Sequence, residues 1–175
     1  MSLVLMIAFA LTSRVAELWP RDLDADSAAI HVQAAEQAGK NLHVKEGATE
    51  LLLALAWTES RFDPTATSRK VGAKRKVGSW RSTSPAGQGP WFCGVVQTMA
   101  YYDWNKCLEM RDISKGYKAG VEELNYWLDK THGNVIQALN GHQCGNIGPT
   151  TACGGKGYGA RVFALAQKLK RRPTS

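Results

Sequence analysis

Residues 51–64 read LLLALAWTESRFDP, an apolar run followed by a single glutamate, Glu59. If the run is a helix, Glu59 lies on the same stripe as Leu52 and Leu55, because residues three and four apart share a helix face. A carboxyl group on a core-facing stripe is costly to ionise, so it can hold a proton near neutral pH, as a general acid must. The alternative is a helix-terminal glutamate whose head group reaches solvent. We therefore expect Glu59 to be either a sheltered catalytic acid or an ordinary residue at a helix end.

Apolar residues at helical spacing continue on both sides of this stretch, while strand-like alternation is scarce. Besides the helix that ends near Glu59, capping and stop signals predict helices from Asp24 or Asp26 to about Ala38, from near Val95 through Gln97 and Tyr101, from Tyr117 to near Gly133, from Asn134 through Leu139, and from Tyr158 to Leu169. Residues 65–93 hold six Gly and Pro residues and are expected to form a loop or a short hairpin. The 175 residues are thus predicted to form one mainly α domain.

The N-terminal segment, residues 1–22, is apolar and admits two interpretations. Residues 3–11 are too short to span a bilayer as a helix, so we expect no transmembrane span. The tripeptide Ala8-Phe9-Ala10 resembles a small-residue cleavage site, but no Lys or Arg precedes it. The segment is either a weak export signal or the first helix, and residues 23–175 are expected to form the folded domain.

Positive charge is concentrated in one segment. The formal net charge is +7, and no acidic residue lies between Asp63 and Asp103. Six basic residues fall in this interval: Arg69, Lys70, Lys74, Arg75, Lys76 and Arg81. A basic loop of this kind attracts a polyanion such as nucleic acid, an anionic cell wall or acidic lipid. The alternative is a solvated loop without a specific partner.

The chain has four cysteines, an even count that suits two disulfides in an oxidising compartment. Cys144 and Cys153 flank a Gly-rich loop and are the easier pair to join, which leaves Cys93 with Cys107. A zinc site that uses His142 beside Cys144 lacks support from any C-x-x-C spacing. Free thiols are the other alternative. We expect disulfides and no bound metal.

Four short motifs follow one another along the chain. They are Glu59-Ser60-Arg61-Phe62, Gly94-Val95-Val96-Gln97, Ala138-Leu139-Asn140, and Tyr158 at the start of the last helix. In this order and spacing the chain resembles the lytic transglycosylases of the soluble (SLT) type, which share the lysozyme-like superfold with goose-type lysozymes. Val95 and Val96 replace the Leu and Met of the family's second motif, and Leu139 replaces the Tyr of the third. The resemblance implies a lysozyme-like, mainly α domain with a long basic loop or small hairpin between the first two motifs.

The resemblance also implies a reaction. Members cleave the β-1,4 bond between N-acetylmuramic acid and N-acetylglucosamine in peptidoglycan. Glu59 would protonate the leaving oxygen and then take the proton of the sugar's own C6 hydroxyl, which gives a 1,6-anhydro product. The substrate's acetamido oxygen can stabilise the developing positive charge, so neither a second carboxylate nor a cofactor is required.

Motif positions supply the expected substrate-binding residues: Ser60, Gly94, Val96, Gln97, Asn140 and Tyr158. Tyr158 lies on an apolar stripe, so its buried hydroxyl needs a partner, and Glu59 is the expected one. Gln97 offers a donor and an acceptor to an acetamido group or to Glu59. Four of these residues have a structural alternative: a helix-end hydroxyl for Ser60, a solvated helix residue for Gln97, a turn residue for Asn140, and structural filling of the core for Tyr158.

Other functions remain open. A goose-type lysozyme would hydrolyse the same bond and would use a second carboxylate, for which Asp103, Glu109 and Asp112 are the candidates. A nucleic-acid-binding module would use the basic loop and not Glu59, but the chain carries no known nucleic-acid motif, so nucleic acid is not an expected partner. A wall-binding module that has lost activity is a further alternative. The expected partners are glycan strands and, at the basic loop, an anionic envelope component, in the periplasm, outside the cell or on a phage particle.

Overall fold

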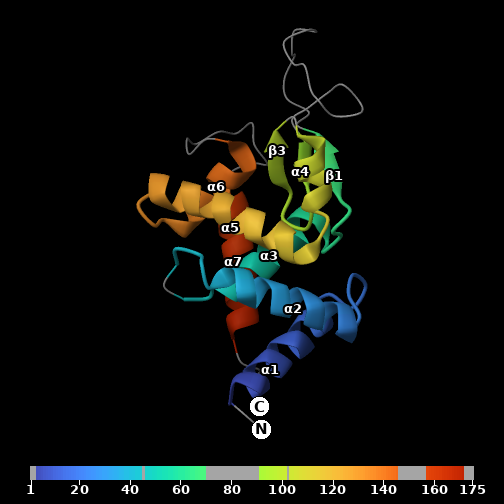
Figure 1. Cartoon of the computed structure of the whole chain (residues 1–175). Coiled ribbons are helices and arrows are strands. Elements are labelled where there is room, and N and C mark those ends of the chain that lie inside the picture. The colour runs from blue at the N-terminus through green and yellow to red at the C-terminus, as the bar shows by residue number, and fades with distance from the viewer. Residues whose placement is uncertain (1–2, 45, 70–90, 102, 146–156, 172–175) are drawn as a thin grey trace, which may run out of the picture.

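The computed structural model of the chain describes residues 3–44, 46–69, 91–101, 103–145 and 157–171. Its elements are the helices α1 (Leu3–Leu18), α2 (Ala25–Gly39), α3 (Ala48–Ser60), α4 (Trp104–Glu109), α5 (Ile113–Lys130), α6 (Val135–Cys144) and α7 (Tyr158–Lys170), and the strands β1 (Thr67–Arg69), β2 (Trp91–Cys93) and β3 (Thr98–Tyr101). The predicted mainly α architecture is confirmed. Figure 1 shows the helices gathered around α3, with the small sheet set to one end of the molecule.

Helix α3 forms the centre of the core. Residues 51–56 are all buried, so this helix is apolar on every side and is enclosed by its neighbours. It packs against α2 and α7, and α5 contacts it as well. The chain leaves α3 at Arg61, which adopts a left-handed conformation with φ 58°. The C-terminal end of α3, which carries Glu59, therefore emerges directly from the main hydrophobic core.

Local signals in the sequence account for the other helices. Asp24 caps α2 by accepting a hydrogen bond from the Ser27 N–H at 2.7 Å, and Asn134 caps α6 through the Gln137 N–H at 3.1 Å. The predicted stripe of α5 consists of buried residues: Tyr117, Val121, Leu124 and Leu128. Capping and periodicity thus place these helices where the sequence predicts them.

The helix predicted from near Val95 through Gln97 and Tyr101 is wrong. Residues 94–97 form a turn, and residues 98–101 form β3, which pairs antiparallel with β2. Gly94 and Gln97 both have positive φ, 74° and 50°, which stops a right-handed helix from forming there. Strands β1 and β2 also pair antiparallel, and the sheet has the order β1-β2-β3. The antiparallel pair β1–β2 agrees with the short hairpin expected between the first two motifs. Most of the basic loop lies between them, outside the described residues.

A second, smaller apolar cluster supports the sheet. It consists of Trp91, Cys93, Ala100, Cys107 and Met110. Within it, Cys93 and Cys107 form a disulfide that joins β2 to α4. Cys144 is disulfide-bonded as well, and Cys153 lies outside the described residues. The sheet end of the domain therefore has a covalent connection in addition to its apolar contacts.

Helix α1 packs on the helical end. Leu11, Val15 and Trp19 are buried in the main core, and Arg14 donates hydrogen bonds to the carbonyl oxygens of Leu169 and Arg171 beside the end of α7. Within the described residues, no helix combines the length and the apolar character that crossing a bilayer requires. Whether residues 1–22 act as an export signal stays a prediction.

Candidate active site at the meeting of α3 and α7

Glu59 lies in the last turn of α3 and is half-buried. Tyr158, the first residue of α7, is 2% exposed, and its hydroxyl donates a hydrogen bond to Glu59 Oε1. Burial raises the pKa of Tyr158 well above its ordinary value, and the charge of Glu59 raises it further. The phenol therefore remains a hydrogen-bond donor throughout the physiological pH range and fixes the orientation of the carboxyl group.

The second motif forms a tight turn beside this pair. Gly94 begins the turn with a φ of 74°, and a Cβ at this position would lie 2.2 Å from the Met110 carbonyl oxygen. A side chain at position 94 is therefore excluded on two grounds, backbone conformation and space. Val95 and Val96 are both fully buried, and Val96 packs on Gly120 of α5.

Side chains from α3 and α6 hold the main chain of this turn. The Ser60 hydroxyl lies 2.7 Å from the Val95 carbonyl oxygen, and the His142 Nε2 donates to the Val96 carbonyl oxygen at 3.1 Å. Ser60 thus contacts the turn; no hydrogen bond from it to Glu59 is observed among the described residues. The turn is fixed through its carbonyl oxygens from both sides.

Gln97 also binds main-chain carbonyl oxygens, as Ser60 and His142 do. Its side-chain amide donates to the Ala66 carbonyl oxygen at 2.9 Å and to the Gly94 carbonyl oxygen at 3.0 Å, and only 6% of the residue is exposed. The amide closes the turn and connects it to the segment after α3. A contact of Gln97 with substrate stays a prediction.

Asn140 ties α6 to the start of α7. Its Oδ1 accepts a hydrogen bond from the Gly159 N–H at 2.8 Å, directly beside Tyr158. A Cβ on Gly159 would lie 2.2 Å from the Ile136 carbonyl oxygen, so the two helices approach too closely here for a side chain. Asn140 therefore helps to place the tyrosine that contacts Glu59, and its contact with substrate stays a prediction.

Two further charged residues, which the motifs do not include, lie behind the turn. Glu123 of α5 and His142 of α6 form an ion pair with 3.5 Å between Oε1 and Nδ1, and their side chains are only 18% and 3% exposed. Burial alone would lower the pKa of His142, but the Glu123 carboxylate, with a further contribution from Glu59, raises it to about 9. The sequence contains one signal for this pair, since Glu123 shares a helix stripe with Gly116 and Gly120, both of which pack on the second motif.

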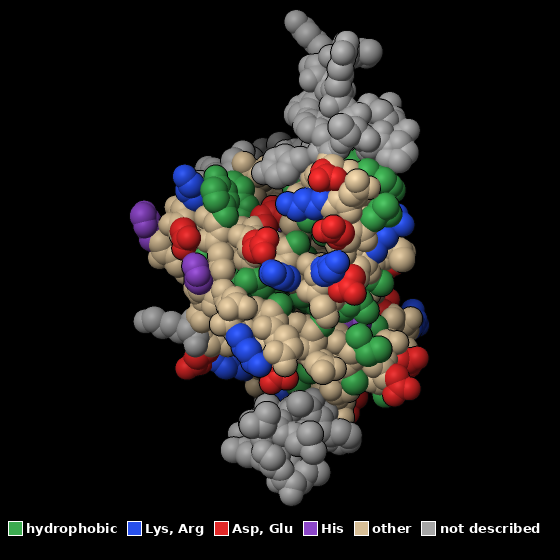
Figure 2. Space-filling model, in the orientation of Figure 1, with side chains coloured by type: hydrophobic (Ala, Val, Ile, Leu, Met, Phe, Trp, Pro, Cys, Tyr) green, Lys and Arg blue, Asp and Glu red, His purple; other side chains and the backbone are tan. Residues whose placement is uncertain are grey.

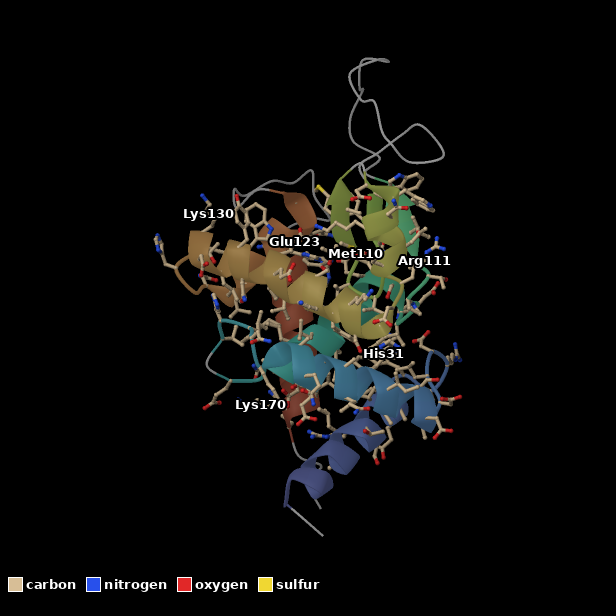
Figure 3. All side chains as sticks on the ribbon, in the orientation of Figure 1. His31, Met110, Arg111, Glu123, Lys130 and Lys170 are labelled. Atoms are coloured by element: carbon tan, nitrogen blue, oxygen red, sulfur yellow. A yellow bond between two sulfur atoms is a disulfide. The ribbon has the colours of Figure 1, made fainter. Side chains whose placement is uncertain are left out.

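A cavity of about 460 Å³ opens where the second motif ends. Its walls come from β3, α4, α5 and Gly145, and Glu123 forms part of them (Figure 3). Glu59 is not among the residues that line the cavity. On the face shown in Figure 2, acidic and basic side chains are interspersed and neither sign forms a large patch.

Two of the three carboxylates considered for a hydrolase cap helices. Asp103 caps α4 through the Lys106 N–H at 3.0 Å, and Asp112 caps α5 through the Lys115 N–H at 2.9 Å. Glu109 is exposed. In the part of the chain that the structure describes, no three His, Cys, Asp or Glu side chains are grouped to hold a metal ion.

Comparison with known families gives one match. Residues 36–150 match the family model described as the Transglycosylase SLT domain. This region covers more than half of the chain and contains Glu59, the second motif and α6. No curated protein and no solved structure matches the chain.

Proposed function

The chain belongs to the transglycosylase SLT domain family, the peptidoglycan lytic transglycosylases, and from this membership we propose that Glu59 is the acid and base that cleaves the glycosidic bond. The family's substrate is peptidoglycan, and its members are enzymes. The bond proposed here is the β-1,4 linkage between N-acetylmuramic acid and N-acetylglucosamine. The observation that carries the assignment of Glu59 is the hydrogen bond from the buried Tyr158 hydroxyl to its carboxyl group.

The proposed reaction has two proton transfers through one residue. Protonated Glu59 gives its proton to the glycosidic oxygen while the bond from that oxygen to C1 of N-acetylmuramic acid breaks. The acetamido oxygen of the same sugar stabilises the positive charge that develops at C1. The Glu59 carboxylate then takes the proton of the C6 hydroxyl as the C6 oxygen bonds to C1. The product is a 1,6-anhydro sugar, and Glu59 returns to its protonated form.

A lysozyme-type hydrolase would need a second carboxylate to activate the attacking water, whereas the proposed intramolecular reaction does not. Asp103 and Asp112 are engaged in helix capping, and Glu109 is exposed, so none of these three is placed to activate water. Tyr158 supports the proposed reaction by holding one oxygen of Glu59, so the carboxyl group keeps one orientation between the two transfers.

The proposed place of action is outside the cytoplasm, where peptidoglycan lies. The Cys93–Cys107 disulfide suits the oxidising periplasm or the exterior of a cell, and a phage particle that opens the wall is an equally suitable setting. An anionic envelope component is the proposed partner of the basic segment that includes Arg75 and Arg81.

Mass spectrometry of the fragments released from purified sacculi tests this proposal. The parent enzyme should release anhydro-muropeptides, and Glu59→Gln should lower the rate by about 10²- to 10⁴-fold, because the amide cannot transfer a proton. Glu50→Gln, a matched change in the first turn of α3, should leave the rate unchanged. Products with a reducing-end muramic acid from the parent enzyme would show that it is a lysozyme-type hydrolase. Full activity of Glu59→Gln would contradict the proposed role of Glu59.

A further inference from the structure

Glu123 is a carboxylate at the cavity that the proposed reaction does not use. It projects from α5, and both of its oxygens are oriented by neighbours: Oε1 lies 3.5 Å from His142 Nδ1, and Oε2 accepts from the Met99 N–H at 3.3 Å. The side chain is 18% exposed and forms part of the cavity wall. Glu123 thus faces the cavity, whose wall also includes Glu122, and it is contacted by His142 of α6 and by the main chain of β3.

The contacts of the two His142 ring nitrogens indicate the charge of this pair. A carbonyl oxygen only accepts, so the contact with Val96 requires a hydrogen on His142 Nε2. The second nitrogen faces the Glu123 carboxylate, and a hydrogen there completes an imidazolium–carboxylate pair. Burial tends to raise the pKa of Glu123, but the charge of His142 outweighs it and holds that pKa below its ordinary value. The carboxylate is consequently ionised and a weak base at neutral pH.

The remaining cavity wall suits a carbohydrate. Trp127 and Tyr126 of α5 supply aromatic surface, Met99 and Met110 supply apolar surface, and Lys106 supplies one cation. Ligand sites commonly combine such apolar walls with a few fixed polar groups. Aromatic faces can stack on sugar rings, whose edges carry N–H and O–H donors. An ionised carboxylate forms stronger hydrogen bonds with such donors than a neutral acceptor does.

We propose that Glu123 is a substrate-binding residue that accepts a hydrogen bond from an N–H or O–H group of an N-acetylated sugar in the cavity beside the second motif. The inference rests on the proposed function, because the sugar it binds belongs to the glycan strand that Glu59 cleaves. His142 is the positioning residue of this contact. It keeps the carboxylate ionised and links it, through the Val96 carbonyl oxygen, to the turn next to the active site.

Binding measured without turnover tests the proposal. In a Glu59→Gln background, calorimetry with a short β-1,4-linked N-acetylglucosamine oligosaccharide should show a Kd about 10- to 100-fold higher when Glu123→Gln is added. Asp129→Asn is the matched control. Asp129 lies on α5, as Glu123 does, but it pairs with His43 at the surface and does not line the cavity. In the active enzyme, Glu123→Gln should raise KM more than it lowers kcat.

A second measurement needs no change at Glu123. In the Glu59→Gln protein the same oligosaccharide should shift the amide NMR resonance of Met99, because this N–H donates to the Glu123 carboxylate. Unchanged affinity of the Glu123→Gln protein, or a Met99 resonance that stays fixed while the sugar binds, would overturn the inference. Either result leaves Glu59 untested, whereas an active Glu59→Gln enzyme would remove the proposed reaction without affecting the binding result.

Discussion

Two buried histidines, His31 on α2 and His142 on α6, lie in different parts of the molecule and differ in charge: one is neutral and the other is positive. His31 is 3% exposed; its Nδ1 lies 3.2 Å from the Tyr117 hydroxyl, and its ring packs against Phe62. Burial lowers the pKa of His31 to about 4. His142 is 4% exposed, yet the Glu123 carboxylate outweighs burial and raises its pKa to about 9.

The difference shows that burial by itself does not decide the charge of a histidine in this fold. Both rings contact a residue of α5, a neutral phenol in one case and a carboxylate in the other. The neutral histidine lies in the aromatic part of the core, and the charged one lies behind the candidate site. Buried charge is thus placed where it can act on a polar substrate, and the helical core next to α2 is kept neutral.

The largest expected effect is the loss of one partner of the charged pair. His142→Ala should lower the free energy of unfolding by about 3–5 kcal/mol, because it leaves the Glu123 carboxylate partly buried without a counter-charge. His31→Ala should lower it by about 1–3 kcal/mol, since it removes only a neutral hydrogen-bond partner of Tyr117. Urea unfolding at neutral pH measures both. Equal losses would remove the distinction between the two histidines.

The second prediction concerns pH: His142 should lose its contribution to stability as pH rises, and His31 should lose its contribution as pH falls. The pKa of His142 is raised from 6.5 in the unfolded chain to about 9, so its contribution is complete below pH 6.5 and is lost as pH rises toward 9. The pKa of His31 is lowered to about 4, so its contribution is complete above pH 6.5 and is lost as pH falls toward 4. Each loss should amount to about 3 kcal/mol at most.

Thermal or urea unfolding between pH 4 and pH 9 would measure these two limbs. His142→Gln should flatten the alkaline limb, and His31→Gln should flatten the acid limb and leave the alkaline limb unchanged, because glutamine keeps a polar side chain but does not titrate. An alkaline limb that persists in His142→Gln, or one that disappears in His31→Gln, would show that the charges are assigned to the wrong histidines.

The smallest expected effect belongs to a third histidine, which pairs with a carboxylate at the surface. His43 Nδ1 lies 3.2 Å from Asp129 Oδ1, with side chains 59% and 69% exposed. Asp129→Asn should change the free energy of unfolding by less than about 1 kcal/mol, because water and salt screen an exposed pair. Repeating the measurement at higher ionic strength should abolish even that change. A loss as large as that of His142→Ala would mean that exposure does not govern the strength of these pairs.

Sequence reasoning placed the helices well because their signals are local. Asp24 and Asn134 cap within three residues of their partners, and the stripe of α5 repeats every three or four residues. The segment after Gly94 was predicted wrongly because its strand is decided by pairing with β2, whereas its apolar residues fit either period. The family of the chain could be predicted from four short motifs, and the family match confirmed it.

The ion pair behind the turn could not be predicted in the same way. Glu123 and His142 are 19 residues apart on two helices, and only the packing of α5 against α6 brings them together. Asn140 shows a related limit. Its presence in a motif predicts a functional position, but its contact with the Gly159 N–H depends on how closely α7 approaches α6.

The second motif is held by Ser60 and His142 through the carbonyl oxygens of Val95 and Val96, groups that any amino acid would supply. Drift at positions 95 and 96 can therefore proceed among apolar residues of fitting volume without moving the turn. Ser60 and His142 do not have this freedom, because few other side chains would place a hydrogen-bond donor at the same carbonyl oxygens. Among descendants of this gene, we expect positions 95 and 96 to vary among apolar residues, and Ser60 and His142 to persist.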